Sequence, residues 1–410
     1  MMVCPPLSRR LICSTSAASC TNLSLASPLL VRFLEGGKPA REGPEYLDEL
    51  SGKPWAKEYL MKKSKRKIFI AIILSLSVIC TALILIAPRY GNLSINLPLE
   101  HKPAFAADTS AYPSQLRAEG NKLIDVNRQV VTLRGLMPAD PAVLRRKGKF
   151  DRLFFDRMAD SGANVIRLPV HPERWERDPD YLWRYLDPAV QWNGENGVYT
   201  IIDLHFIGDI GTDRGVQMPD IKIPSEDFAL EFWLQTASYF KDTPHVIFEI
   251  FNEPADISAS DWRTNAQALV DAIRSTGADQ LIIVGGIEYS RNLSWVLEEP
   301  IKGENIAYAA HIYPAHGRYS WERWFGAVAE KYPVVMTEWG WMESDPDGKQ
   351  PYLVGRRSSY GEPLMEYLDQ RGIGWVACWY DDEWKPAMFA SDFEQATPFG
   401  EFVLQRLSGQ

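Results

Sequence analysis

Two glutamates, each following an apolar run typical of a buried strand, are the residues best placed to do chemistry. Glu253 comes after residues 246–251, and Glu338 comes after residues 333–337. A carboxylate at the end of a buried strand is costly to leave without a partner. Parallel barrels gather their reactive side chains at the carboxyl ends of their strands. Two such carboxyl groups would suit a proton donor and a nucleophile, so glycoside hydrolysis is the first chemistry to consider.

Short apolar runs alternate with amphipathic stretches over residues 111–410, which predicts repeating strands and helices. The first predicted strand ends at Gly135, and the other seven are expected at 164–168, 200–204, 246–251, 281–284, 306–310, 334–337 and 374–379. Alternation alone also fits a doubly wound open sheet. The number of strands favours an α/β fold of the (β/α)8 TIM-barrel type.

Smaller features of this region predict how the barrel is completed. Helices are expected near 149–160 and 180–193, and Asn196-Gly197 is a stop signal for the second of them. A hairpin made by residues 121–125 and 129–133 is expected to close the floor of the barrel.

The N-terminal part of the chain predicts a transmembrane helix ahead of the barrel. Residues 68–87 carry no charge and would span roughly 30 Å as a helix, while residues 62–67 are mostly basic. By the positive-inside rule, this signal-anchor would insert into the lipid bilayer and place the C-terminal domain outside the cytoplasm. Secretion after cleavage near residues 104–106 is the alternative. Residues 1–61 are interpreted as a disordered or mis-called extension, and residues 88–110 as a linker.

Composition excludes several classes of protein. The net charge of -9 gives no reason to expect a nucleic-acid partner, and 46% hydrophobic residues argue against global disorder. Of the 5 cysteines, only Cys378 lies in the predicted barrel, where no CxxC pair suggests zinc. Cys378 is interpreted as a small buried apolar residue. We expect neither a metal nor a cofactor.

A set of strand-end residues resembles a known family. Asn252-Glu253-Pro254 occurs together with Arg167, Asp203-Leu204-His205, His311-Ile312-Tyr313, Glu338 and Trp379, in that order. This pattern resembles glycoside hydrolase family 5, the cellulase family, in the retaining clan whose glutamates follow strands four and seven. The resemblance covers all eight predicted strands and implies a barrel without a metal cofactor.

The resemblance implies a role for each of these residues. Glu253 would be the acid/base and Glu338 the nucleophile, with their carboxyl groups about 5 Å apart. Asn252 would hydrogen-bond the 2-hydroxyl of the sugar, and Arg167 and Tyr313 would hold Glu338 ionised and oriented. His205 and His311 would bind sugar hydroxyls or buffer the acid, and Trp379 would lie beneath the distorted sugar ring. Each could instead have an ordinary structural role, such as a surface ion pair, a satisfied histidine or a core aromatic.

Further residues near the strand ends have less specific interpretations. Glu249 is interpreted as a buried network member, and the run 381–383 as a solvated acidic loop in preference to a calcium site. The tryptophans and the arginine that could form outer sugar platforms or pack in the rim are Trp339, Trp341, Trp384, Trp175 and Arg174.

The leading hypothesis is a retaining, endo-acting β-1,4-glucanase that binds a β-linked polysaccharide or oligosaccharide. A β-mannanase is the alternative within the family, since the catalytic set is shared. A carbohydrate-binding surface protein on an inactive barrel is the alternative from another class. A metal-dependent hydrolase is disfavoured because no His-x-His motif follows the first strand.

Overall fold

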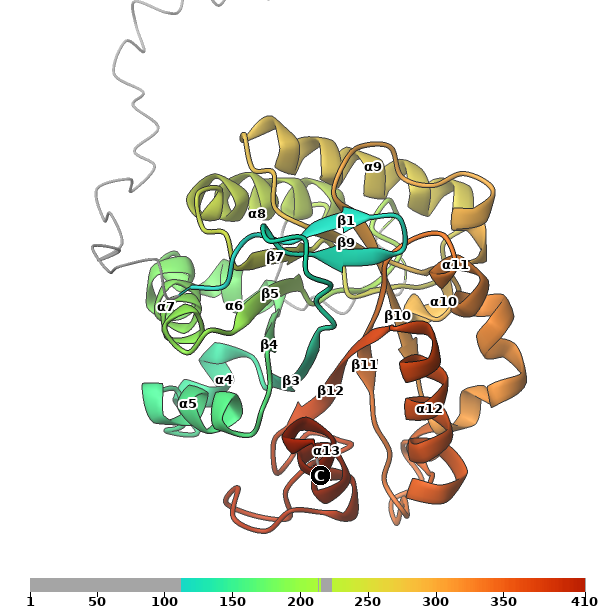
Figure 1. Ribbon diagram of the computed structural model, residues 1–410. Helices are drawn as coiled ribbons and strands as arrows, with labels where there is room; N and C mark the ends of the chain where they lie inside the picture. The colour runs from blue at the N-terminus through green and yellow to red at the C-terminus, as the bar shows by residue number, and fades with distance from the viewer. Residues whose placement is uncertain (1–111, 213, 215–222, 410) are drawn as a thin grey trace, which may run out of the picture. The chain divides into compact units, whose positions relative to one another are not determined.

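The structure of the protein is a computed structural model that describes residues 112–212, 214 and 223–409. Eight parallel strands form a closed barrel in the order β10-β11-β12-β3-β4-β5-β7-β9 (Figure 1). Their bounds are β3 (Arg134–Pro138), β4 (Val165–Val170), β5 (Tyr199–Leu204), β7 (Val246–Glu249), β9 (Ile282–Gly285), β10 (Ile306–Ile312), β11 (Val334–Trp339) and β12 (Gly374–Tyr380). The prediction of a TIM barrel is confirmed.

Helices surround the barrel and connect consecutive strands (Figure 1). They are α4 (Pro141–Arg146), α5 (Arg152–Asp160), α6 (Pro172–Arg177), α7 (Asp187–Glu195), α8 (Ser225–Phe240), α9 (Ala259–Ser275), α10 (Ile287–Ser290), α11 (Ala327–Ala329), α12 (Glu362–Arg371) and α13 (Pro398–Ser408). Capping side chains define several starts: the carboxylate of Asp151 accepts from the Phe154 amide at α5, and Ser258 accepts from the Asp261 amide at α9.

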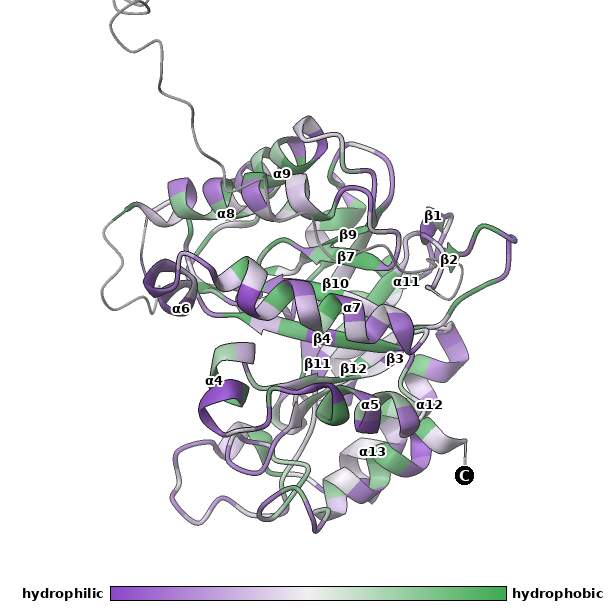
Figure 2. Cartoon of the chain, turned by 90° about the vertical axis from the view of Figure 1, so that its left-hand side faces the viewer, coloured by the Kyte–Doolittle hydropathy of each residue, from purple (hydrophilic) through white to green (hydrophobic). Residues whose placement is uncertain are grey.

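Side chains alternate along each strand between the barrel interior and the shell beneath the helices. On β5, Tyr199 and Ile201 belong to the interior cluster, whereas Ile202 and Leu204 pack in the shell. This alternation explains why the strands read as continuous apolar runs, since both faces are buried. In Figure 2 the strands are mostly green, while purple residues gather on the helices.

The floor of the barrel is closed by a hairpin that differs from the predicted one. Strand β1 (Arg117–Glu119) pairs with β2 (Lys122–Ile124), and the predicted second arm at 129–133 contributes only one bridge, between Ile124 and Val130. The predicted pairing is therefore present but short: the Asp125 amide donates to the Gln129 carbonyl and the Val131 amide donates to the Leu123 carbonyl. The tight turn at Gly120, with φ of 59°, adds a strand at Arg117–Glu119 that was not predicted. Leu123 still packs into the interior cluster, so the expected plug exists.

Predicted boundaries differ from the observed ones by a few residues. The fourth strand ends at Glu249 instead of 251, and the seventh continues to Trp339 and so includes Glu338. A π-helical turn at Leu182–Leu186 opens the second predicted helix, which ends at Asn196 as expected.

The predicted transmembrane helix at 68–87 and its basic flank lie outside the described residues, as do the predicted extension and linker. Within the parts of the chain that the structure describes, no helix is long and apolar enough to cross a bilayer.

Replacing Leu123 by alanine tests the hairpin plug. Leu123 is 6% exposed and fills the floor, so Leu123→Ala is expected to lower the free energy of unfolding by about 2–5 kcal/mol. Val126→Ala is the control, because Val126 is 67% exposed and its truncation should change stability by about 0.5 kcal/mol or less. Denaturant unfolding measures both. Equal effects of the two substitutions would contradict the plug.

Candidate active site

A buried arginine ties together the carboxyl ends of four barrel strands. From β4, the Arg167 guanidinium donates to Glu338 Oε1 of β11 at 2.8 Å and to Glu249 Oε2 of β7 at 2.6 Å. It also donates to Asn252 Oδ1 at 2.8 Å and lies 3.1 Å from Asp203 Oδ2 of β5. Because Arg167 is fully buried, its charge needs these partners. Glu249 is therefore part of a buried network, as the sequence indicated.

Glu338 is held as a carboxylate from two sides. Arg167 approaches one of its oxygens, and the Tyr313 hydroxyl donates to the other at 2.8 Å. Burial alone would raise the pKa of Glu338, but the nearby charges of His311 and Arg167 outweigh burial and lower the pKa to about 2. A buried, oriented and ionised carboxylate of this kind is suited to act as a nucleophile.

Glu253 lies opposite Glu338 in a different environment. It belongs to β8 (Glu253–Pro254), a short strand that pairs with β6 (Ile207–Gly208) at the mouth of the barrel. His311 Nδ1 lies 2.9 Å from Glu253 Oε1. Burial raises the pKa of Glu253, and the neighbouring charge of Glu338 also raises it, against the hydrogen bond from His311. Glu253 is thus the carboxyl group suited to keep a proton.

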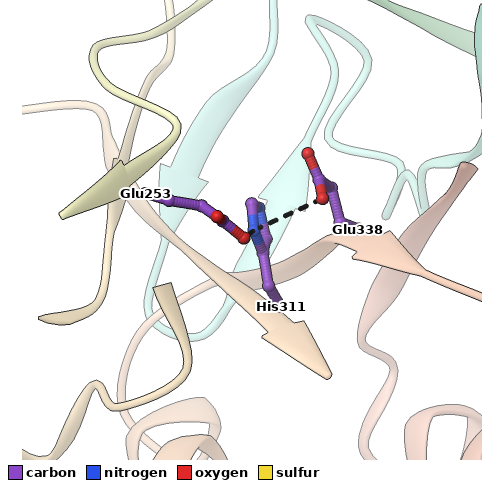
Figure 3. A group of neighbouring side chains, drawn as sticks. All are labelled: Glu253, His311 and Glu338. Carbon is purple, nitrogen blue, oxygen red and sulfur yellow. Dashed lines mark hydrogen bonds and ion pairs between the residues drawn. The ribbon is translucent and has the colours of Figure 1, made fainter. Parts of the chain in front are cut away.

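The three side chains converge on one point (Figure 3). One carboxylate oxygen of Glu253, one of Glu338 and a ring nitrogen of His311 all lie within 4.8 Å of one another. The separation of about 5 Å expected from the sequence matches this geometry. At this distance the ionised carboxylate can attack an anomeric carbon directly, without an intervening water, while the carboxyl group that holds a proton protonates the leaving oxygen.

A metal ion would have to displace contacts that this trio already makes. Both oxygens of Glu338 accept from Arg167 and Tyr313, and Arg167 brings a full positive charge to the same point. Carboxylates that bind a divalent cation need free oxygens directed at it. We therefore assign no metal to the group.

His205 and His311 occupy different places: His205 follows β5, whereas His311 lies near the end of β10. His205 Nδ1 lies 2.7 Å from Asp203 Oδ2 and thus contacts the arginine network. Burial lowers the pKa of His205 well below its usual value, so this ring is neutral, and burial raises the pKa of Asp203 to about 7 despite Arg167. Of the two histidines, His311 is the one hydrogen-bonded to Glu253.

Aromatic rings line the mouth beside these groups. The Trp379 ring lies 5.7 Å from that of His205 and 4.7 Å from that of Trp384, and His171 lies 5.4 Å from Trp384. Trp379 is 9% exposed, so only a small part of this residue is accessible from the mouth. These rings form a wall suited to stacking on sugars.

The remaining platform candidates belong mainly to the packed shell. Trp339 and Trp341 are buried against Phe399 and Phe402 of α13, so core packing accounts for both. Trp175 packs against Phe232. Arg174 Nε lies 3.8 Å from Asp140 Oδ2.

The solvated-loop interpretation of residues 381–383 was wrong for Asp381. Asp381 is fully buried, and Lys147 Nζ lies 2.7 Å from its Oδ1, 3.3 Å from Asp382 Oδ1 and 3.1 Å from Glu383 Oε2. Only Glu383 is well exposed. The lysine supplies the positive charge that these carboxylates require, and it attaches the loop after β12 to the loop after α4.

Cys378 is buried as expected, but its thiol is not merely an apolar filler. Its sulfur lies 3.2 Å from the Tyr313 hydroxyl, directly beneath the contact of that hydroxyl with Glu338. The tyrosine gives its hydrogen to Glu338, and the single hydrogen of the thiol has two acceptors within reach, the Tyr313 oxygen and the Trp339 carbonyl oxygen at 3.6 Å.

Three residues of the site were missed by the sequence analysis. His171 follows β4 directly and pairs with Asp140, so the strand-end signal could have found it. Thr337 precedes Glu338 and bridges His311 to Glu249. Tyr352 lies 5.6 Å from Tyr313, ring to ring, and it belongs to a short 3₁₀ turn at Pro351–Leu353 that no local pattern marks.

The ionisation of Glu338 predicts how stability depends on pH. Its pKa is lowered from 4.5 to about 2, so its contribution is complete above pH 4.5 and is lost as the pH falls toward 2. Glu338→Gln should therefore lower the free energy of unfolding at pH 7 by on the order of 3 kcal/mol. The deficit relative to the unsubstituted protein should shrink steadily below pH 4.5.

Denaturant unfolding across this pH range measures the deficit. Glu366→Gln on α12 is the control, because Glu366 is exposed and should show a small difference with little trend. A deficit for Glu338→Gln that stayed constant down to pH 2.5 would contradict the assigned ionisation.

Comparison with known proteins places this geometry among carbohydrate-active barrels. The curated relatives include endoglucanase A of Butyrivibrio fibrisolvens, 28% identical over 247 residues that cover 58% of this chain and 54% of the relative. Cellulase CelDZ1 of a Thermoanaerobacterium species is 29% identical, covering 53% of this chain and 57% of the relative. The chain thus spans about half the length of the curated relatives it matches.

Solved structures agree with the relatives. A β-glucanase from Saccharophagus degradans superimposes with a TM-score of 0.68 at 29% identity, over 73% of this chain and 95% of that one. The cellulase (glycosyl hydrolase family 5) model matches residues 146–383, more than half of the chain. This protein belongs to glycosyl hydrolase family 5, the cellulase family.

Proposed function

We propose that the protein is a retaining β-glycosidase that cleaves β-1,4-linked glucan chains internally by double displacement. Glu338 attacks the anomeric carbon and forms a glycosyl ester, while Glu253 protonates the departing oxygen. Glu253 then takes a proton from water, which displaces Glu338 and restores both groups.

The separation of the two carboxyl groups carries this proposal. Oxygens of Glu253 and Glu338 lie within 4.8 Å, whereas inverting enzymes hold their carboxyl groups about 6.5–9.5 Å apart to admit a water. Their pKa values also move in opposite directions: that of Glu253 is raised and that of Glu338 is lowered. Such a divergence distinguishes a proton donor from a nucleophile.

The supporting residues fit the same reaction. The Asn252 side-chain oxygen accepts from Arg167, so its amide hydrogens are left to meet a sugar hydroxyl. A contact of this kind with the 2-hydroxyl strengthens as the ring approaches the transition state. Trp379 and Trp384 would form the wall along which the glucan lies.

The sugar is inferred from the relatives. Several curated relatives are endoglucanases, and a β-glucanase that is 28% identical to this chain has been crystallised with cellotetraose. On this basis we propose β-1,4-glucan as substrate, with mannan as the outcome to be tested against it.

Two assays of the full chain test substrate and mode of action. Release of reducing ends from carboxymethylcellulose should exceed release from β-mannan, and viscosity should fall early because internal bonds break. Proton NMR of the first products should show retained β configuration. Inverted products, or no activity on any β-glycan, would contradict the proposal.

Substitution of the two glutamates should give different defects. Glu338→Gln should lower turnover at least about 10³-fold on every substrate, because it removes the attacking group. Glu253→Gln should lower kcat/KM about 10²–10⁴-fold for cellulose oligomers but far less for an aryl glycoside with an acidic leaving group, which needs no proton. Steady-state kinetics measure both, and full turnover by Glu338→Gln would favour a non-catalytic binding protein or another nucleophile.

We further propose that residues 68–87 anchor the enzyme in a membrane with the barrel outside the cytoplasm. The uncharged run and the basic residues 62–67 before it support this. The full chain should stay with membranes during alkaline carbonate extraction, and deletion of 68–87 should release it. Recovery of the full chain in the soluble fraction would contradict an uncleaved anchor.

A further inference from the structure

Thr337 lies at the centre of a buried chain of hydrogen bonds behind the proton donor. Its hydroxyl donates to Glu249 Oε1 at 2.8 Å, and His311 Nε2 lies 3.0 Å from the same hydroxyl oxygen. The other ring nitrogen of His311 faces Glu253 at 2.9 Å. Thr337, His311 and Glu249 are all fully buried, so water does not compete for these contacts.

An irregularity in the barrel brings Thr337 to this position. Along the ladder between β10 and β11, Ala310 pairs with Met336 and the next residue, His311, pairs with Glu338. Thr337 is therefore an extra residue in β11. Regular alternation would direct it to the opposite face from Glu338, whereas the bulge lets both consecutive side chains contact His311.

The hydroxyl of Thr337 has one hydrogen, and its direction decides the state of the histidine. Glu249 receives that hydrogen on Oε1 and receives Arg167 Nε–H on Oε2 at 2.6 Å; these two donors favour the anion of Glu249, against burial, which raises its pKa. The threonine oxygen is then free only to accept from His311. A hydrogen must consequently lie on Nε2 of His311.

We propose that Thr337 is a positioning residue that fixes the hydrogen of His311 on Nε2, so that Nδ1 shares a single proton with Glu253. The proposal rests on the proposed function, in which Glu253 is the acid/base. While the proton lies on Nδ1, the imidazolium donates to the Glu253 carboxylate. When it lies on Glu253, Nδ1 accepts.

Several charges surround His311, and the proposal takes them into account. The titratable and charged groups that face it from neighbouring elements are Glu253, Glu338, Glu249, Arg167, Asp203, His205 and His316. Burial lowers the pKa of His311, but the carboxylates of Glu338 and Glu253 outweigh burial and raise it. The Nε2–H contact to Thr337 adds an acceptor for the charged ring.

Two substitutions of the full chain separate the hydroxyl from the packing. Thr337→Val keeps the shape but removes the acceptor for Nε2–H, whereas Thr337→Ser keeps the acceptor. For phenyl β-cellobioside, whose leaving group needs a proton, Thr337→Val should lower kcat/KM at pH 7 about 10- to 100-fold, and Thr337→Ser should restore most of it. For 2,4-dinitrophenyl β-cellobioside, whose leaving group needs no proton, kcat/KM of the unsubstituted protein, Thr337→Val and Thr337→Ser should agree within about 3-fold.

The pH profile gives a second readout that a purely structural role would not move. Removing the acceptor destabilises the protonated ring, so the proton shared with Glu253 is lost more easily. The basic limb of kcat/KM for phenyl β-cellobioside should therefore move to lower pH in Thr337→Val and stay in place in Thr337→Ser. An unmoved limb in Thr337→Val would overturn the proposal.

A measurement that does not need activity keeps this inference separate from the proposed function. Nitrogen-15 NMR of labelled histidines, with the 6 histidines of the chain resolved by a His311→Asn reference, reports which ring nitrogen carries hydrogen. His311 should be protonated at Nε2 in the unsubstituted protein and in Thr337→Ser, and should change its spectrum in Thr337→Val.

The outcomes distinguish the two ideas. If neither cellobioside is hydrolysed by the unsubstituted protein, the proposed function fails, and the NMR spectrum alone decides the role of Thr337. If the protein is active and Thr337→Val loses equal activity on both substrates, the substitution has damaged the fold generally and the positioning role is wrong. A His311 signal protonated only at Nδ1 would also refute it.

Discussion

The buried guanidinium of Arg167 is the interaction on which the arrangement of the site depends. It joins β4 to the ends of β5, β7 and β11 through Asp203, Glu249 and Glu338, and it orients Asn252. None of these charges would be tolerated alone in the barrel, because burying an unpaired ion costs far more than a typical hydrogen bond returns. Each charged group therefore depends on its ion pairs with the others, and these ion pairs hold the strand ends together.

Negative groups outnumber the buried arginine, and this imbalance creates distinct roles. Arg167 is shared by three carboxyl groups, so they cannot all ionise at ordinary pKa values. Glu338 keeps its charge because His311 and Tyr313 also favour its anion, whereas burial raises the pKa of Asp203 to about 7. The partner of Glu253 is His311 and not Arg167, and Glu253 retains a proton more readily. One charge distribution thus separates a carboxyl group suited to hold a proton from a carboxylate suited to attack.

The sequence predicts the barrel and its two glutamates because both depend on local patterns. Apolar runs reveal strands buried on two faces, and the strand-end rule brings Glu253 and Glu338 together without knowledge of the loops. Contacts between distant segments leave no such pattern. Nothing local shows that His311 meets Glu253, which lies 58 residues away in the chain. The acidic run at 381–383 looked solvated because its lysine partner lies 234 residues away.

Two departures from barrel regularity show why the remaining details escape a sequence-based argument. Strict alternation sends consecutive residues to opposite faces, yet the site needs Thr337 and Glu338 on one side. An extra residue in β11 keeps the strand paired with β10 and still brings both side chains to His311. A similar register shift in β12 leaves Trp379, between Cys378 and Tyr380, without a partner in the ladder with β3. Both shifts lie at the carboxyl ends of their strands, beside the reacting groups. Regular strand pairing builds the core of the barrel, and the local register shifts direct additional side chains into the site.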